Sequence, residues 1–238
     1  MKETLANKLR KVLPVRSCGA VIVAAGTASR MGGIDKVMAP LCAEPMIVHT
    51  VRAFQESPVI DQIVIVTRKD LVDTIGALCK GMDKVTAVVE GGADRQASVE
   101  AGLAALSPKL KMAAIHDGAR PLISQEVIDR TVRAAHTYSA AAPGIPVKDT
   151  IKVAKGGVVL NTPDRSTLFA IQTPQVFDRD LLVGALQKAR AEEAAITDDC
   201  SAVERLGMSV KIVEGDEKNL KVTTPLDLKV AQLLMEGM

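Results

Sequence analysis

The sequence predicts an α/β fold in which a mostly parallel sheet is flanked by helices. Six short runs of apolar, largely β-branched residues are spaced along the chain, and helix-length segments separate most of them. Strands that alternate with helices of this length are typical of βαβ units. The composition agrees, because 47% of the residues are hydrophobic and only 2% are aromatic. Buried parallel strands are rich in such aliphatic side chains.

Each expected element follows from the local pattern. The six apolar runs are the expected strands, at residues 20–23, 63–67, 85–89, 113–116, 140–145 and 210–213. The helices are expected at residues 46–57, 70–80, 97–106, 125–138, 180–194, 199–206 and 225–234, the last with a proline near its first position. No repeat or low-complexity linker interrupts the chain. We therefore expect an N-terminal extension over residues 1–17 and a single domain over residues 18–238.

One region departs from the alternation of strands and helices. Residues 146–165 read PVKDTIKVAKGGVVLNTPDR, with β-prone runs at 150–154 and 158–161 on either side of Lys155-Gly156-Gly157. A Gly-Gly pair between two such runs indicates a β-hairpin. A hairpin inserted in a helix-covered sheet has little core of its own. We expect either a lid or an arm, over about 146–165, that packs on another subunit.

Charge and composition exclude several classes of protein. The formal net charge of +2 favours no polyanion partner, and the near absence of aromatic residues argues against nucleic-acid readers that stack bases. The four cysteines form no C-x-x-C pair, so we expect free thiols in a reducing compartment rather than zinc ligands or disulfides. No apolar run reaches the length of a membrane span, and the basic N-terminus lacks the apolar core of a signal peptide. These features predict a cytoplasmic protein that binds neither nucleic acid nor membrane.

The first expected strand leads into a turn that could bind a nucleotide. Residues 21–36 read VIVAAGTASRMGGIDK. Small residues after a strand allow a ligand to approach the backbone, whose N–H groups suit phosphate oxygens. The dinucleotide motif is broken by Ala28, and the P-loop motif lacks its Gly-Lys pair. The two cations Arg30 and Lys36 favour a triphosphate, although a tight turn with solvated cations is the alternative.

Two further expected strands also end in polar residues. Residues 91–98 open a helix whose N-terminus would attract an anion, with ordinary capping by Asp94 as the alternative. After the strand at 113–116, Asp117 could hold a hydroxyl, an amine or a hydrated metal, and Arg120 could hold a phosphate. His116 is not expected to be catalytic, since no Ser or Cys nucleophile pairs with it.

Two later segments complete the set of candidate residues. Thr197-Asp198-Asp199 is compatible with a metal site or with the N-cap of the following helix. Lys221, near the end of the last expected strand, could be a third cation in the same cleft. The whole set contains several cations and no nucleophile paired with a base. It therefore indicates a reaction that depends on positioning and charge neutralisation, such as phosphoryl or nucleotidyl transfer.

Taken in order, the motifs resemble those of the 2-C-methyl-D-erythritol 4-phosphate cytidylyltransferase family of the non-mevalonate isoprenoid pathway. The resemblance extends over residues 18–234. It rests on AAGTASRMG with Lys36, GGADRQASV, HDGARPL, PVKDTI, TPQVF, ITDD and VEGDEKNLKVTTPLDL. It implies a Rossmann-like nucleotidyltransferase fold and attack of the substrate phosphate on the α-phosphorus of CTP. The products would be the CDP-alcohol and pyrophosphate.

The resemblance also implies roles for individual residues. The catalytic cations would be Arg30, Lys36 and Lys221. The CTP-binding residues would be Ala24, Ala25, Gly26, Gly92, Ser98, Asp117 and Gly118. The residues for the polyol phosphate would be Arg120, Thr150, Arg165, Thr173 and Thr197. Thr150 and Arg165 would serve a second subunit, because the hairpin arm crosses over in a homodimer.

The resemblance implies Mg²⁺ as the cofactor, held mainly by the CTP phosphates and water and by no dedicated protein ligands. Two alternatives remain open on these residues. A ribitol-5-phosphate cytidylyltransferase shares the fold and the chemistry. A non-catalytic nucleotide-binding protein could also have this fold, although the three cations argue against it.

Overall fold

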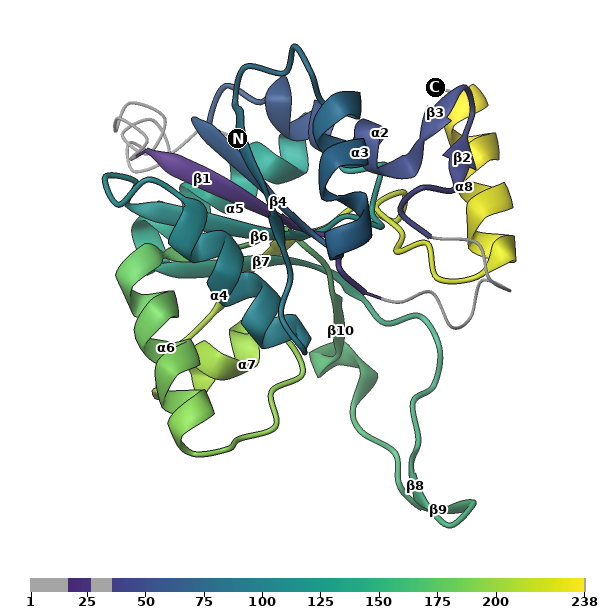
Figure 1. Cartoon of the computed structure of the whole chain (residues 1–238). Coiled ribbons are helices and arrows are strands. Elements are labelled where there is room, and N and C mark those ends of the chain that lie inside the picture. Colours follow the sequence, from purple (N-terminus) through teal and green to yellow (C-terminus); the bar gives the residue numbers. More distant parts are fainter. Residues whose placement is uncertain (1–16, 27–35, 238) are drawn as a thin grey trace, which may run out of the picture.

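The centre of the molecule is one eight-stranded sheet (Figure 1). The computed structural model describes residues 17–26 and 36–237. Along the sheet the strands follow the order β10-β7-β11-β6-β1-β4-β5, and β12 pairs with β7. The strands are β1 (Cys18–Val23), β4 (Gln62–Thr67), β5 (Val85–Glu90), β6 (Met112–Asp117), β7 (Ala140–Pro146), β10 (Phe169–Ile171), β11 (Gln175–Asp178) and β12 (Lys211–Glu214).

The sheet is mostly parallel, as the sequence predicts. β1 pairs in parallel with β4 and β6, β4 pairs in parallel with β5, and β12 with β7. The six predicted strands are confirmed, with small differences at their ends. β10 and β11 were not predicted, and both run antiparallel to β7, with β11 inserted between β6 and β7. The sequence did not reveal them because both are short and lie on either side of Pro174, and a proline argues against a strand.

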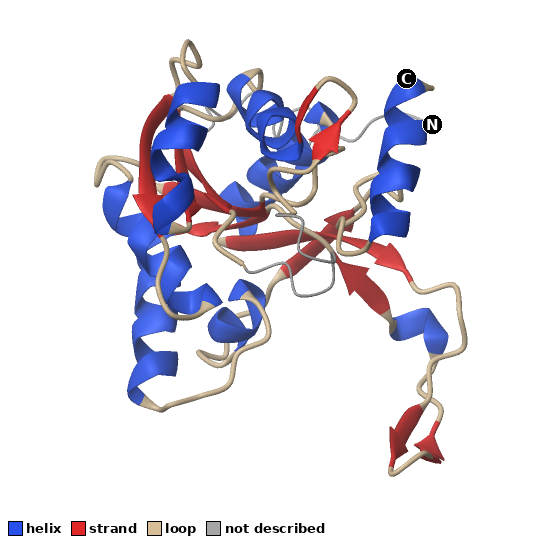
Figure 2. Cartoon of the chain, turned by 45° about the vertical axis from the view of Figure 1, so that its right-hand side comes forward, coloured by secondary structure: helices blue, strands red, loops and turns tan. Residues whose placement is uncertain are grey.

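Helices cover both faces of the sheet (Figures 1 and 2). All seven predicted helices are present and differ from the prediction by a few residues at their ends. They are α2 (Met46–Gln55), α3 (Val72–Leu78), α4 (Arg95–Ala105), α5 (Gln125–Tyr138), α6 (Arg179–Ala191), α7 (Asp199–Glu204) and α8 (Pro225–Glu236). A 3-10 turn, η1 (Lys69–Leu71), precedes α3 and takes up the residues with which that helix was expected to begin.

The two faces of the sheet have separate cores. In β1, Ala20 and Ile22 point into a cluster with side chains of α2, α3 and α5, whereas Val21 points into a cluster with α4, α6 and α7. This alternation is the period-2 pattern of a strand that is buried on both faces. A third, smaller cluster lies between α8 and the short strands β2 (Pro40–Leu41) and β3 (Glu44–Pro45). Among the helices described, none is long and apolar enough to cross a bilayer.

The predicted hairpin is confirmed as an arm that projects from the body of the molecule (Figures 1 and 2). The arm spans about residues 146–165. Its hairpin is formed by β8 (Val153–Lys155) and β9 (Val158–Asn161), and the first strand begins later than the expected residue 150. Gly156 and Gly157 form the turn with φ of +59° and +79°. A type I′ turn requires a positive φ at both central residues, which glycine adopts without strain. A short 3-10 turn, η2 (Arg165–Thr167), follows β9 and leads back to the sheet.

Candidate active site

A pocket of about 500 Å³ lies at the carboxyl ends of the neighbouring parallel strands β1, β4, β5 and β6. Ligands of open α/β sheets bind at this edge. The residues that line it are Val23, Ala24, Ala25, Gly26, Lys36, Val37, Arg68, Lys69, Glu90, Gly91, Gly92, Ala93, Asp94, Arg95, Ser98, Asp117, Ala119 and Lys221. Eight residues of the predicted site are therefore brought together here: Ala24, Ala25, Gly26, Lys36, Gly92, Ser98, Asp117 and Lys221.

Small residues form one wall of the pocket, and two of the glycines are required by close packing. A Cβ on Gly91 would lie 2.5 Å from Ala25 Cβ, and one on Gly92 would lie 2.2 Å from Ala97 Cβ. The Gly92 N–H donates to Ser98 Oγ at 3.2 Å. Ser98 thus fixes the turn that leads into α4. Asp94 caps this helix by accepting from the Ala97 N–H, which confirms the capping alternative for this residue.

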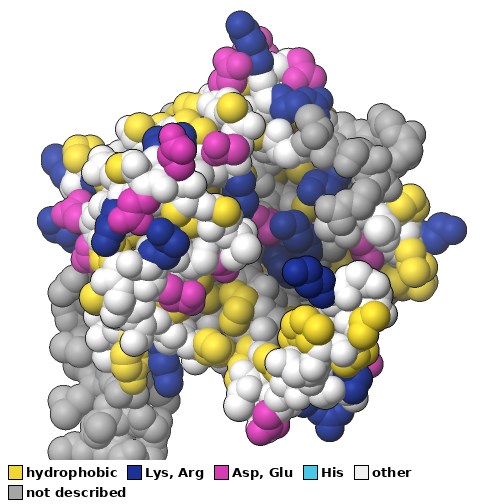
Figure 3. Space-filling view, turned by 90° about the horizontal axis from the view of Figure 1, so that it is seen from below, with side chains coloured by type: hydrophobic (Ala, Val, Ile, Leu, Met, Phe, Trp, Pro, Cys, Tyr) yellow, Lys and Arg dark blue, Asp and Glu magenta, His cyan; other side chains and the backbone are white. Residues whose placement is uncertain are grey.

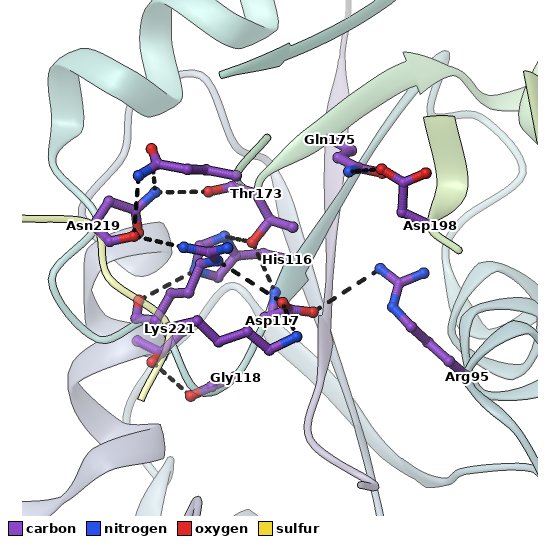
Figure 4. Close-up of polar contacts among 12 residues, drawn as sticks. Arg95, His116, Asp117, Gly118, Thr173, Gln175, Asp198, Asn219 and Lys221 are labelled. Carbon is purple, nitrogen blue, oxygen red and sulfur yellow. Dashed lines mark hydrogen bonds and ion pairs between the residues drawn. The ribbon is translucent and has the colours of Figure 1, made fainter. Parts of the chain in front are cut away.

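Asp117 lies among three cations at the end of β6 (Figure 4). Its carboxylate oxygens lie 2.8 Å from Lys221 Nζ, 3.8 Å from Arg120 Nε and 3.9 Å from Arg95 Nη2. Burial alone would raise the pKa of this carboxyl, but the neighbouring cations outweigh burial and lower the pKa below its usual value. Asp117 is therefore an anion that holds the side chain of Lys221 at the pocket.

The pocket is rich in positive charge. Among the residues that the structure describes, five cationic side chains line it: Lys36, Arg68, Lys69, Arg95 and Lys221. On the face of the molecule shown in Figure 3, Lys and Arg side chains gather around a hollow. Cations that converge on a concave site raise the local concentration of anionic ligands. The electrostatics therefore suit a polyphosphate.

Arg95 is a functional candidate that the list of expected site residues did not include. Besides its contact with Asp117, it donates from Nη2 to Asp199 Oδ2 at 2.7 Å. Asp199 is fully buried, and burial raises the pKa of its carboxyl even beside this arginine. Two features of the sequence could have marked Arg95 as a site residue. One is its place in the first turn of a helix, and the other is the adjacent pair of carboxylates Asp198 and Asp199. Which arginine pairs with which carboxylate depends on the tertiary fold.

The segment 197–199 leads into α7, with Asp198 as the N-cap of that helix. Asp198 accepts from the Ser201 N–H at 2.9 Å in a capping box, which confirms the capping alternative. Across the residues that the structure describes, no three His, Cys, Asp or Glu side chains converge in a way that could hold a metal ion. Thr197 is exposed and lines a second hollow beside α7, which shares Asp94 and Arg95 with the lining of the pocket.

His116 is fully buried, and both of its ring nitrogens have hydrogen-bond partners. Its Nδ1 lies 3.0 Å from Thr173 Oγ1 and its Nε2 lies 3.3 Å from the Arg120 carbonyl oxygen. Burial lowers the pKa of the imidazole to about 3, so the ring is neutral near pH 7.

The remaining predicted residues lie away from the pocket lining. Arg120 is mostly buried behind Asp117 and donates from Nη1 to the Asn219 carbonyl oxygen at 2.6 Å. Thr173 lies behind the same strand end, where its Oγ1 accepts from the Asp117 N–H at 3.1 Å. The Gly118 carbonyl accepts from Thr50 Oγ1 at 2.9 Å.

Two of the predicted substrate residues are on the arm, and one catalytic candidate is not described. Thr150 and Arg165 are exposed and do not line the pocket of their own chain. Arg30 lies outside the described residues, as does the predicted N-terminal extension up to residue 16.

Known proteins are similar to this chain in sequence and in fold. The family model for 2-C-methyl-D-erythritol 4-phosphate cytidylyltransferase matches residues 18–237. The protein of that name from Symbiobacterium thermophilum is 47% identical over 218 residues, which cover 91% of this chain and 92% of the relative.

Solved structures agree with the sequence comparison. The crystal structure of 4-diphosphocytidyl-2C-methyl-D-erythritol synthase from Anaerococcus prevotii superposes with a TM-score of 0.84 at 32% identity, covering 93% of this chain and 96% of that one. The 2-C-methyl-D-erythritol 4-phosphate cytidylyltransferase of Thermus thermophilus superposes with a TM-score of 0.78 at 30% identity, covering 92% and 99%. The resemblance seen in the motifs is confirmed, and the chain belongs to the 2-C-methyl-D-erythritol 4-phosphate cytidylyltransferase family.

Proposed function

We propose that this enzyme transfers the cytidylyl group of CTP to 2-C-methyl-D-erythritol 4-phosphate. The observation that carries the proposal is the pocket itself, in which Lys36, Arg95 and Lys221 face a wall of small residues at one edge of the sheet. A phosphate oxygen of the alcohol phosphate attacks the α-phosphorus of CTP. The bond between this phosphorus and the bridging oxygen to the β-phosphate breaks, and pyrophosphate leaves with the electron pair.

The chain contributes positioning and charge to this step. Negative charge grows on the α-phosphate oxygens and on the departing pyrophosphate, and fixed cations stabilise it. Arg30 and Lys36 are assigned to this charge, and Lys221 to the α-phosphate. The backbone of Ala24, Ala25, Gly26 and Gly92, together with Ser98, contacts the cytidine, while Asp117 and Gly118 face the ribose. Arg120, Thr173 and Thr197 belong on the side of the alcohol phosphate.

The carboxylates at the pocket are consistent with a metal ion that is held mainly by the phosphates of the substrate. Within the described part of the chain, the carboxylates that line the pocket are Glu90, Asp94 and Asp117, and the last two already have partners in the Ala97 N–H and Lys221. Mg²⁺ keeps several waters and binds substrate phosphates with few protein ligands. Bound in this way, Mg²⁺ would neutralise part of the triphosphate charge.

The arm supports a homodimer. Seven large apolar side chains on the arm and on the strand that follows it are exposed, and Val158 and Leu160 are 66% and 63% accessible. The full set is Ile151, Val153, Val158, Val159, Leu160, Phe169 and Ile171. Contiguous exposed apolar residues mark an interaction site. We assign a second copy of the chain to this surface, so that Thr150 and Arg165 serve the partner's pocket.

Two further assignments complete the proposal. Residues 18–238 act as one nucleotidyltransferase domain, which is consistent with the continuous sheet. The enzyme works in the cytoplasm, which is consistent with four free thiols, three of them buried.

The experiment that tests the function measures pyrophosphate release from CTP and Mg²⁺ with a panel of polyol phosphates. We expect 2-C-methyl-D-erythritol 4-phosphate to give the highest kcat/KM. Faster turnover of ribitol 5-phosphate would contradict the choice of alcohol. CTP binding without pyrophosphate release from any alcohol phosphate would support a non-catalytic binding protein instead.

A further inference from the structure

Lys221 lies on a segment without regular secondary structure, between β12 and α8. Its ammonium group lies 2.8 Å from Asp117 Oδ2, but its side chain is 42% exposed, so this ion pair alone holds it weakly. A catalytic cation must be held close to its working position. The residues that fix this segment therefore decide where Lys221 can act.

One buried amide side chain fixes the start of the segment. Gln172, which is 4% exposed, donates from Nε2 to the Asp216 carbonyl oxygen at 2.8 Å and accepts from the Asp216 N–H at 3.2 Å. Both peptide groups of Asp216 are thus bound by the same side chain. The Gln172 Nε2 also lies 3.3 Å from the Asn219 carbonyl oxygen.

A second buried amide fixes the segment directly before Lys221 (Figure 4). Asn219 is fully buried and donates from Nδ2 to the Thr173 carbonyl oxygen at 2.9 Å and to Gln172 Oε1 at 3.4 Å. On the other side of Lys221, the Val222 N–H donates to the Ala119 carbonyl oxygen at 2.8 Å. The backbone around Lys221 is therefore anchored to the residues that follow β10 and β6.

We propose that Gln172 and Asn219 form an amide clamp, a pair of positioning residues that hold Lys221 at the pocket. The inference rests on the proposed function, because it gives Lys221 a role in transfer. Water cannot replace these hydrogen bonds, since both side chains are buried, and a buried polar group that loses its partner drives the segment to rearrange. The clamp acts through Lys221 and touches no substrate.

The clamp also joins the catalytic segment to the root of the arm. Gln172 follows directly after β10, whose partner in the sheet is the end of β7 from which the arm departs. Lys148 in the arm reaches the same segment through an exposed ion pair with Glu217 at 2.5 Å. The segment that carries Lys221 thus contacts residues at both ends of the arm.

The test is a double-mutant cycle on the full-length enzyme. In Gln172→Leu, the leucine side chain is close in size to glutamine but cannot make the hydrogen bonds to Asp216. We expect it to lower kcat by roughly tenfold to a hundredfold, because a misplacement of about 1 Å can cost that much. In the Lys221→Ala background, the same substitution should change kcat by less than about twofold, because interacting residues are not additive.

Two further variants keep the test independent of folding. Asn219→Ser changes the second residue of the clamp. It is measured in the wild-type and Lys221→Ala backgrounds, with circular dichroism and the thermal unfolding midpoint as checks of folding. Gln125→Leu is the matched control. Its amide donates to the Ala53 carbonyl oxygen at 2.6 Å, away from the pocket, and we expect wild-type kcat.

The outcomes separate the clamp from the proposed function. A loss that Gln172→Leu and Asn219→Ser produce equally with and without Lys221 would show a general structural role and overturn the clamp. Wild-type turnover by Lys221→Ala would overturn both the role of Lys221 and the clamp. An absence of pyrophosphate release by the wild-type enzyme would overturn the proposed function itself.

Discussion

At the scale of single residues, the site combines the buried carboxylate of Asp117 with several cations. Asp117 keeps its charge because Lys221, Arg95 and Arg120 surround it, and in return it orients Lys221. Because Asp117 is buried, removing a cation beside it leaves a buried charge without its partner, which costs more than the pair contributes. The cations must therefore be tested by their effect on turnover, with folding measured alongside.

We expect Lys36→Ala to lower kcat by roughly a hundredfold or more, because it removes a fixed charge from the transition state. The substitution should leave the circular dichroism spectrum unchanged, since Lys36 lines the pocket and belongs to none of the helices or strands described. Steady-state kinetics with CTP and the alcohol phosphate measure the effect. Lys80→Ala, at an exposed position outside the pocket, is the control. A variant that retains near-normal kcat would remove Lys36 from the catalytic set.

Because the pKa of the buried His116 imidazole is low, we expect the folded protein to lose stability in acid. The unfolded residue titrates near pH 6.5, whereas burial lowers the pKa in the folded protein to about 3. Between these values the unfolded chain binds a proton that the folded chain does not, so stability falls as the pH falls. At pH 4 this one residue costs roughly 3 kcal/mol of unfolding free energy relative to pH 7.

Urea unfolding at pH 7 and pH 4 checks this expectation. His116→Asn retains a polar side chain but does not titrate, so the variant should lose less stability on acidification than the wild type. Equal losses in the two proteins would show that other groups cause the acid sensitivity.

At the scale of elements, α4 lies so close to β1 and β4 that a side chain at one of its positions would force its neighbours to shift. A Cβ on Gly102 would lie 2.3 Å from Val21 Cγ1 and 2.8 Å from Val66 Cγ2. The same helix carries Arg95 and Ser98 in its first turn, at the pocket. Packing of the helix against the sheet therefore sets where these side chains lie.

We expect Gly102→Ala to destabilise the protein by about 1–3 kcal/mol, because overpacking forces the helix or its neighbours to shift. Gly184→Ala is the opposite case. Gly184 is in the middle of α6, and a Cβ added there would meet no neighbouring atom within 4 Å, so alanine should stabilise by up to about 1 kcal/mol. Thermal unfolding of both variants measures the difference. Equal shifts would show that helix propensity, and not contact with the sheet, decides both positions.

At the scale of the whole molecule, the arm gives the proposed dimer a testable geometry. If Arg165 serves the partner's pocket and Lys221 its own, mixed dimers of Arg165→Ala and Lys221→Ala contain one intact site. After unfolding and refolding of an equimolar mixture, about a quarter of the wild-type activity should return, because random pairing makes half of the dimers mixed.

Each variant refolded alone is the control and should stay inactive. Sedimentation checks that the mixture is dimeric. A mixture with no more activity than the separate variants would place Arg165 and Lys221 in the same subunit's site, or in no common site.

Much of the fold could be predicted, but the site only in part. The six strands, the seven helices and the hairpin follow from local periodicity and turn residues, and the structure confirms them. β10 and β11 were missed because each is short and Pro174 interrupts the pattern between them. Asp117 and Lys221 were singled out by their places near strand ends and Lys36 by its place in the turn after the first strand, and all three line the pocket. Gln172 and Asn219 have no local signal that marks a buried amide.

By itself, the sequence determined the fold class, the family motifs and the chemistry, because hydrophobic period, turn residues and charged side chains are local properties. Only the tertiary structure decided which groups meet. Arg95 and Asp199 are 104 residues apart in the chain, and Arg120 and Asn219 are 99 apart. Their contacts depend on the strand order, which places β11 beside β6 and β12 beside β7, so that the segments following these strands reach the site. Charged side chains in a sequence can suggest a phosphate site, but burial and distance decide which of them form it.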